Sequence, residues 1–259
     1  MSVYFESLFK ELLSIAYKDT SYNKDNNLSM TAFLTVSTLI EYSSHDKQDK
    51  FEEILLFLMN NLDNTLTNTQ IDVQKNFDFQ CYIVCVIDSI FKKYTRMLSK
   101  EVVLRYLTIL ENTFKMRNGV YDEAILSISS LALSILNFFY KDQKENFDIS
   151  MNRVLQYLTY SLTKTEETSI CRSAVIAIGD ISKAIGVKFA NYSNEFVPIL
   201  VKILQENDAS KQIKILVINI LGDISMNIPE QFFNYLEIIM NLLFSACQLA
   251  LSISEPVNI

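Results

Sequence analysis

Two cysteines, Cys81 and Cys85, stand one helical turn apart, a spacing that could place two thiolates on one metal ion. A structural zinc site normally needs four ligands, drawn from cysteine, histidine and carboxylate side chains. The only histidine of the chain, His45, lies in a separate polar stretch. The ligand set is therefore incomplete. We expect the two cysteines to be small core residues, and His45 to be a solvated loop residue.

Two glycines occur in a short motif that appears twice. The segment 178–182 reads Ile-Gly-Asp-Ile-Ser, and 43 residues later the segment 221–225 reads Leu-Gly-Asp-Ile-Ser. Neither Gly179 nor Gly222 follows a strand or sits in a glycine-rich turn, so neither belongs to a phosphate-binding loop. We expect both to allow close helix packing. Because no nucleophile, base or metal set converges anywhere, we expect no catalytic activity and no cofactor.

The repeated motif indicates a repeat architecture. Periods of about 20–50 residues are typical of solenoids, in which each unit contacts only its neighbours. The composition agrees with helices joined by polar loops, because the 259 residues are 49% hydrophobic and include only 4 Gly and 3 Pro. Apolar residues recur at spacings of three and four throughout, and no strand-like alternation of any length is present.

Charge and cysteine use restrict the partners. The formal net charge is −7, which repels nucleic acid and favours basic partners, although plain solubility explains it equally well. The four cysteines form no disulfide framework and no signal peptide begins the chain, so we expect a reducing compartment. No apolar run is long enough to suggest a membrane span.

The periodicity predicts five pairs of helices and one unpaired helix. We expect them at 3–16 with 29–42, 48–66 with 77–95, 99–116 with 120–139, 147–163 with 168–185, 190–206 with 210–227, and 229–250.

Two of these pairs come close to the HEAT-repeat pattern. The clearer one has Pro198 in its first helix, Asp208 in the turn and Lys214 six residues later. In that pattern the proline tilts the first helix and the acid caps the second. With the stretches 4–13, 171–180 and 222–237, the chain resembles the central-to-C-terminal repeats of the importin beta (karyopherin beta-1) family.

The resemblance implies an all-α HEAT-repeat solenoid, a right-handed superhelix of antiparallel helix pairs. We expect one array of about five and a half repeats over residues 1–259. Importin beta is more than three times longer, and its acidic loop, its Ran-binding repeats and its cargo-contacting tryptophans have no counterpart here. The chain is therefore expected to be a segment of a longer receptor, or a truncated homologue.

Acidic residues recur at one phase of the second helices: Asp88, Asp180 and Asp223. One interpretation is a solvated face or a contact to a neighbouring repeat. In the importin beta family, however, second helices line the inner concave face that grips basic adaptors. The resemblance therefore implies a partner-binding acidic ladder for these three carboxylates.

Aromatic residues recur near the start of successive first helices: Phe189, Tyr192, Phe196, Phe232 and Tyr235. One interpretation is core packing between repeats. The resemblance offers another, because importin-beta-like proteins hold the phenylalanine rings of nucleoporin FG repeats in shallow pockets on the outer face.

The resulting hypothesis is a segment of a nuclear transport receptor that shuttles between cytoplasm and nucleus through the nuclear pore. Its expected partners are an importin-alpha-type adaptor or basic cargo, FG nucleoporins and, through the full-length receptor, the GTPase Ran. The rival hypothesis is a HEAT-repeat scaffold, such as a phosphatase scaffold or a coat adaptor subunit.

Overall fold

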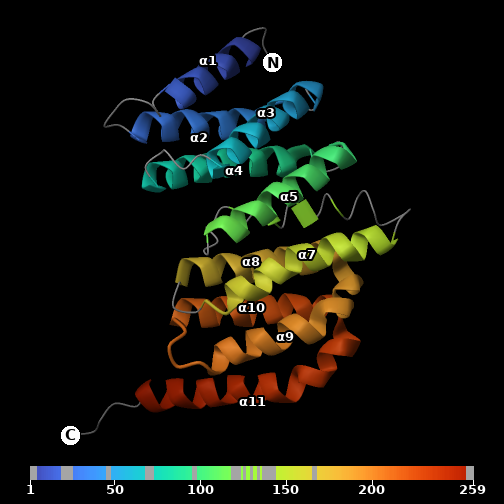
Figure 1. Cartoon of the computed structure of the whole chain (residues 1–259). Coiled ribbons are helices and arrows are strands. Elements are labelled where there is room, and N and C mark those ends of the chain that lie inside the picture. Colours follow the sequence, from blue (N-terminus) through green and yellow to red (C-terminus); the bar gives the residue numbers. More distant parts are fainter. Residues whose placement is uncertain are drawn as a thin grey trace, which may run out of the picture. The chain divides into compact units, whose positions relative to one another are not determined.

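Apart from short turns, the described residues of the chain are helical, and they contain no strand (Figure 1). The computed structural model describes residues 5–18, 26–44, 48–67, 73–94, 98–117, 144–164 and 168–254, with six further positions between 117 and 144. Its helices are α1 (Phe5–Lys18), α2 (Asn26–Tyr42), α3 (Gln48–Thr67), α4 (Val73–Tyr94), α5 (Lys100–Arg117), α7 (Lys144–Leu162), α8 (Thr168–Ile185), the 3-10 turn η2 (Gly186–Phe189), α9 (Ala190–Gln205), α10 (Lys211–Asn227) and α11 (Pro229–Ser254).

The helix expected at 120–139 falls largely outside the described residues. The positions described there share two properties, helical backbone and a buried side chain: Ala124, Ser127, Ile128, Leu131, Ala132 and Ile135. Their spacing of three and four is that of one helical face turned to a core.

The chain forms two compact units, Met1–Tyr157 and Leu158–Ile259, and α7 crosses from one to the other. In the first unit α2 packs on α1 and α4, and α3 packs on α4 and α5. In the second unit α8 packs on α10, while α9 packs on α10 and α11. Each unit therefore has first helices beside first helices and second helices beside second helices, as in a HEAT-repeat solenoid. The expected all-α fold is confirmed, and a single array over 1–259 stays a prediction.

The apolar stripe of α8 shows why these segments are helices. Its apolar positions at spacings of three and four are buried: Cys171, Ala174, Ile178, Ile181 and Ile185. Burying such side chains stabilises the fold by about 1.5–3 kcal/mol for each large one. The buried apolar stripe of α8 can be recognised in the sequence, and it turns this face of the helix toward the core.

The start of α10 corrects one detail of the HEAT pattern. Asp208 is exposed in the turn, and the N-cap of α10 is Ser210, whose side chain accepts a hydrogen bond from the backbone nitrogen of Ile213. Serine is among the preferred N-cap residues because its oxygen satisfies a free backbone N–H. Pro198 lies inside α9, and the helix continues through it.

The turn from α8 to α9 depends on one glycine. Gly186 has φ 56°, in the left-handed region that residues with a side chain rarely adopt. This backbone conformation ends α8, and the 3-10 turn that follows brings Phe189 into the core with no exposed surface.

In the first unit, Lys93 of α4 holds the C-terminal end of α2. Its Nζ donates hydrogen bonds to the carbonyl oxygens of Ile40 (2.7 Å) and Glu41 (2.6 Å), and also to that of Ser43. The last carbonyls of a helix have no partner within the helix, and positive charge is favourable there. Lys93 therefore connects two second helices of neighbouring repeats.

Replacing this lysine gives a first prediction. Lys93→Met is expected to lower the free energy of unfolding by about 1–2 kcal/mol, because a charged donor to several carbonyls is lost. Lys92→Met is the matched control. Lys92 has a side chain 63% exposed and pairs with Asp88 one turn away, an interaction of about 0.3–0.5 kcal/mol. Urea denaturation of both variants measures the difference, and equal losses would contradict the anchoring role.

Candidate protein-binding surface

A charged cluster joins α8 and α10 in the second unit. Nζ of Lys183 lies 2.9 Å from Oδ2 of Asp223, and the exposed Asp180 stands three residues before Lys183 on α8. Asp180 and Asp223 are one repeat period apart in the sequence. Because α8 packs on α10, they lie on neighbouring helices. We call Asp180, Lys183 and Asp223 the α8–α10 charged cluster.

The electrostatics of this cluster favour a cation. A hydrogen bond and the charge of Asp223, with a smaller contribution from the charge of Asp180, raise the pKa of Lys183 above its usual value. The two acids therefore already stabilise one positive charge of the protein itself. A basic group from a partner would have to share or replace Lys183, whose own side chain is 56% exposed. Sequence reasoning missed this lysine, although its position three residues after Asp180 was a visible signal.

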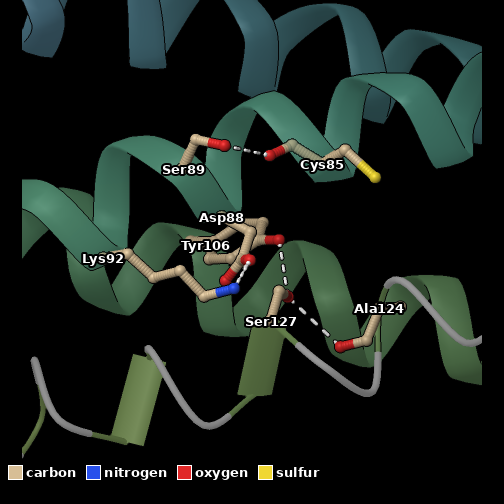
Figure 2. A network of polar contacts seen from close by, with 7 residues as sticks. All are labelled: Cys85, Asp88, Ser89, Lys92, Tyr106, Ala124 and Ser127. Atoms are coloured by element: carbon tan, nitrogen blue, oxygen red, sulfur yellow. Dashed lines mark hydrogen bonds and ion pairs between the residues drawn. The ribbon is translucent and has the colours of Figure 1, made fainter. Parts of the chain in front are cut away.

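Asp88, the third predicted acid, belongs to the first unit and has a different environment. It is 9% exposed, and its Oδ2 lies 2.6 Å from Nζ of Lys92 (Figure 2). Nearby, the hydroxyl groups of Tyr106 and Ser127 are 2.9 Å apart in a buried contact between α5 and the next segment. Burial and pairing therefore favour the first interpretation for Asp88, a contact to a neighbouring side chain, and its role in partner binding stays a prediction.

The predicted aromatic pocket residues are mostly core residues. Phe189 and Phe196 have no exposed surface, and their ring centroids are 6.2 Å apart; Tyr192 and Phe232 are each only 7% exposed. A ring without exposed surface cannot contact a ligand unless the repeat opens. Burial therefore favours the packing interpretation for these four residues.

Tyr235 differs from the other four aromatic residues. It is half-buried on α11, and its hydroxyl donates a hydrogen bond of 2.7 Å to Oδ1 of Asn194 on α9. A similar link joins α7 to α9, where Oγ1 of Thr159 donates to Oε1 of Glu195 over 2.7 Å. These polar contacts connect successive first helices of the second unit, and Tyr235 is the predicted pocket residue whose ring reaches the surface.

Large apolar side chains are exposed on the last two helices. On α10 and α11 they are Ile215, Ile218, Met226, Phe233, Leu236, Ile238, Met240 and Phe244. Exposed apolar side chains that gather on one surface are typical of interaction sites.

The cysteines carry no assembled metal site. Cys81 and Cys171 are buried, Cys85 is partly buried and Cys247 is exposed, and none of these four described residues is in a disulfide. Among the described residues, no three histidine, cysteine or acidic side chains come close enough to hold a metal ion. Cys81 is a core residue as expected, whereas His45 lies outside the described residues. No described helix is both long and apolar enough to cross a membrane.

The two-layer stack of helix pairs and its exposed polar and apolar surfaces define the class of protein. It is an α-solenoid, an architecture that offers extended surfaces to macromolecular partners. The chain belongs to the importin beta family, because the family model described as "Importin subunit beta-1-like, TPR repeats" matches residues 1–258. The spacing of 43 residues between Gly179 and Gly222 fits the period of HEAT repeats, about 40–47, better than the TPR period of about 34.

Individual relatives agree with this assignment. Importin subunit beta-1 of Schizosaccharomyces pombe is 24% identical over 263 residues, covering 99% of this chain and 29% of the relative. The structure of yeast importin-beta (Kap95p) matches with a TM-score of 0.78 at 23% identity, covering 94% of this chain and 28% of that one. A structure of Kap95p described as inducing the switch loops of RanGDP to adopt the GTP-bound conformation matches with a TM-score of 0.69 at 22% identity, over the same shares. The chain thus spans less than a third of the length of these relatives.

Proposed function

We propose that this chain is a protein-binding segment of an importin-beta-type nuclear transport receptor, and that the α8–α10 charged cluster contacts a basic segment of the partner. Membership of a family of transport receptors supports the transport role. It also fits the expectation that the chain has no catalytic activity. The observation that carries the site is the pairing of Lys183 with Asp223, because Asp223 already holds a cationic side chain and the charge of Asp180 adds to this attraction.

The energetics favour many weak contacts over one strong one. An exposed ion pair contributes about 0.2–1 kcal/mol, and salt screens such pairs beyond a Debye length of about 8 Å at physiological ionic strength. A basic partner would therefore gain affinity by contacting several repeats in series, and it would exchange quickly. Both properties suit a carrier that must load and release cargo.

Other partners belong to the proposal through the family. The Kap95p structure with Ran makes the GTPase a candidate partner of the full-length receptor. FG-repeat binding, if it involves this chain, would use the neighbourhood of Tyr235, since the other predicted rings are buried. A receptor of this kind would move between cytoplasm and nucleus.

Charge reversal tests the proposed surface. The variant Asp180→Lys, Asp223→Lys is expected to weaken binding of a basic importin-alpha-type peptide about tenfold, because two contacts are lost and repulsion is added. The control Asp208→Lys, Glu237→Lys reverses two other exposed acids and changes the net charge equally. Isothermal titration at two salt concentrations measures both. Equal weakening by the two double variants would mean that only net charge matters and that the cluster is not the site.

A further inference from the structure

The ammonium group of Lys183 occupies a carboxylate of the neighbouring second helix. Nζ of Lys183 on α8 lies 2.9 Å from Oδ2 of Asp223 on α10, and the two side chains are 56% and 25% exposed. The pair is therefore accessible to solvent, and the lysine is its more exposed member. A basic group that approaches Asp223 meets a position that a positive charge of the chain already holds.

The packing of α8 on α10 does not depend on this ion pair. A Cβ atom built on Gly179 of α8 would lie only 2.3 Å from Cδ1 of Ile220 on α10, so the side chain of Ile220 fills the space that glycine leaves. Around this contact, Val175 and Ser182 of α8 are each 0% exposed. Exposed ion pairs contribute little to stability. Lys183 can therefore leave Asp223 while the two helices stay in place.

A second carboxylate keeps a displaced lysine in favourable surroundings. Asp180 precedes Lys183 by three residues on α8, and side chains with this spacing are neighbours on a helix surface. A hydrogen bond and the charge of Asp223, with a smaller contribution from the charge of Asp180, hold the pKa of Lys183 above its usual value. The lysine thus stays charged at neutral pH, and it remains near an acid when it leaves Asp223.

We propose that Lys183 is an intramolecular competitor of the partner's basic side chains: it holds Asp223 in the free chain, and a partner must displace it to bind there. This inference rests on the proposed function, because it describes how the α8–α10 charged cluster takes up its basic segment.

Such a competitor makes the cluster selective for partners with several basic groups. Two carboxylates and one lysine give the cluster a single net negative charge. An isolated cation gains little by displacing Lys183, because one exposed ion pair is exchanged for another of similar strength. A partner that contacts several repeats at once holds its basic groups at a high effective concentration, so it displaces the lysine more readily.

Removing the competitor is expected to strengthen binding. Isothermal titration of the 259-residue chain with the basic importin-alpha-type peptide measures the effect at low salt. Lys183→Gln should raise the affinity about threefold, because Asp223 no longer has to release a lysine of the chain. The melting temperature should stay nearly unchanged, since the lost ion pair is exposed.

Two control variants separate competition from net charge. Lys202→Gln also removes one positive charge from an exposed lysine of the second unit, whose Nζ lies 3.8 Å from Oε1 of Glu206 on its own side of the molecule's α9 segment. This control should change the affinity by less than about twofold. Lys183→Arg keeps the charge and pairs with carboxylates at least as well as lysine does, so it should not raise the affinity.

A double-mutant cycle places the competition at Asp223. In an Asp223→Asn background, the gain from Lys183→Gln should fall below about twofold, because the contact for which Lys183 competes is gone. A gain as large as in the unchanged chain would overturn the proposal, since Lys183 would then act only through its charge.

The same titrations distinguish this inference from the proposed function. The competitor role is overturned, and the proposed surface stands, if Asp180→Lys, Asp223→Lys weakens peptide binding while Lys183→Gln binds no better than Lys202→Gln. If neither the unchanged chain nor Lys183→Gln binds the peptide at low salt, the proposed function itself fails, and the competitor role fails with it.

Discussion

Replacing Phe196 by alanine is expected to lower the free energy of unfolding by about 3–5 kcal/mol, the usual cost of removing a buried phenylalanine ring. Phe196 of α9 has no exposed surface, and its ring lies against that of Phe189 at the end of the 3-10 turn η2. Loss of that ring leaves a cavity that the surrounding helices can fill only in part. Since whole domains are stable by only about 5–15 kcal/mol, this single change should be visible as a large drop in melting temperature.

Phe233→Ala is the matched control for this change. Phe233 lies on α11 and is 73% exposed, so its removal should alter the free energy of unfolding by about 0.5 kcal/mol or less. Urea denaturation, with FG-peptide binding measured in parallel, separates the two roles of the aromatic residues. If Phe196→Ala kept its stability and lost FG binding, the ring would be a ligand contact and the packing interpretation would be wrong.

The two equivalent glycines are expected to respond in opposite directions. Gly179→Leu should cost about 1–3 kcal/mol, because the new side chain must displace Ile220 and push α8 and α10 apart. Gly222→Leu should stabilise the chain by up to about 1 kcal/mol, because leucine favours helix and nothing occupies the space beside Gly222.

This glycine comparison is best made by thermal denaturation at low protein concentration, where association contributes least. The two positions share the motif and the helical phase, so the comparison isolates the effect of the covering helix. A destabilisation of similar size at both sites would show that Gly222 is covered in solution or that glycine is needed there for another reason.

The helices themselves could be predicted well from the sequence. The predicted segment 168–185 coincides with α8, and the predicted segments 190–206 and 210–227 differ from α9 and α10 by a single residue at one end. Apolar spacing determines these elements locally, and short polar stretches separate them, so little long-range information is needed. The 43-residue period also predicted that these helices form successive repeats, so that equivalent helices of consecutive repeats are neighbours.

The environment of individual side chains could not be predicted in the same way. Lys183 was missed because its counterpart one period later is Met226, so the repeat itself did not mark the position, and only the spacing from Asp180 pointed to it. The burial of Asp88 depends on its neighbours across the repeat, and Gly222 lacks the contact that Gly179 makes. Equal position in a repeat therefore fixes the backbone, whereas exposure depends on which helix lies alongside.

Binding measurements against three kinds of partner test the central claim most directly. Isothermal titration of the 259-residue chain would use a basic importin-alpha-type adaptor peptide, an FG-repeat peptide and Ran loaded with GTP. The account predicts salt-sensitive binding of the basic peptide that the Asp180→Lys, Asp223→Lys variant weakens. If none of the three partners binds at low salt while the chain remains folded, the transport-receptor proposal is contradicted, and a HEAT-repeat scaffold becomes the better interpretation.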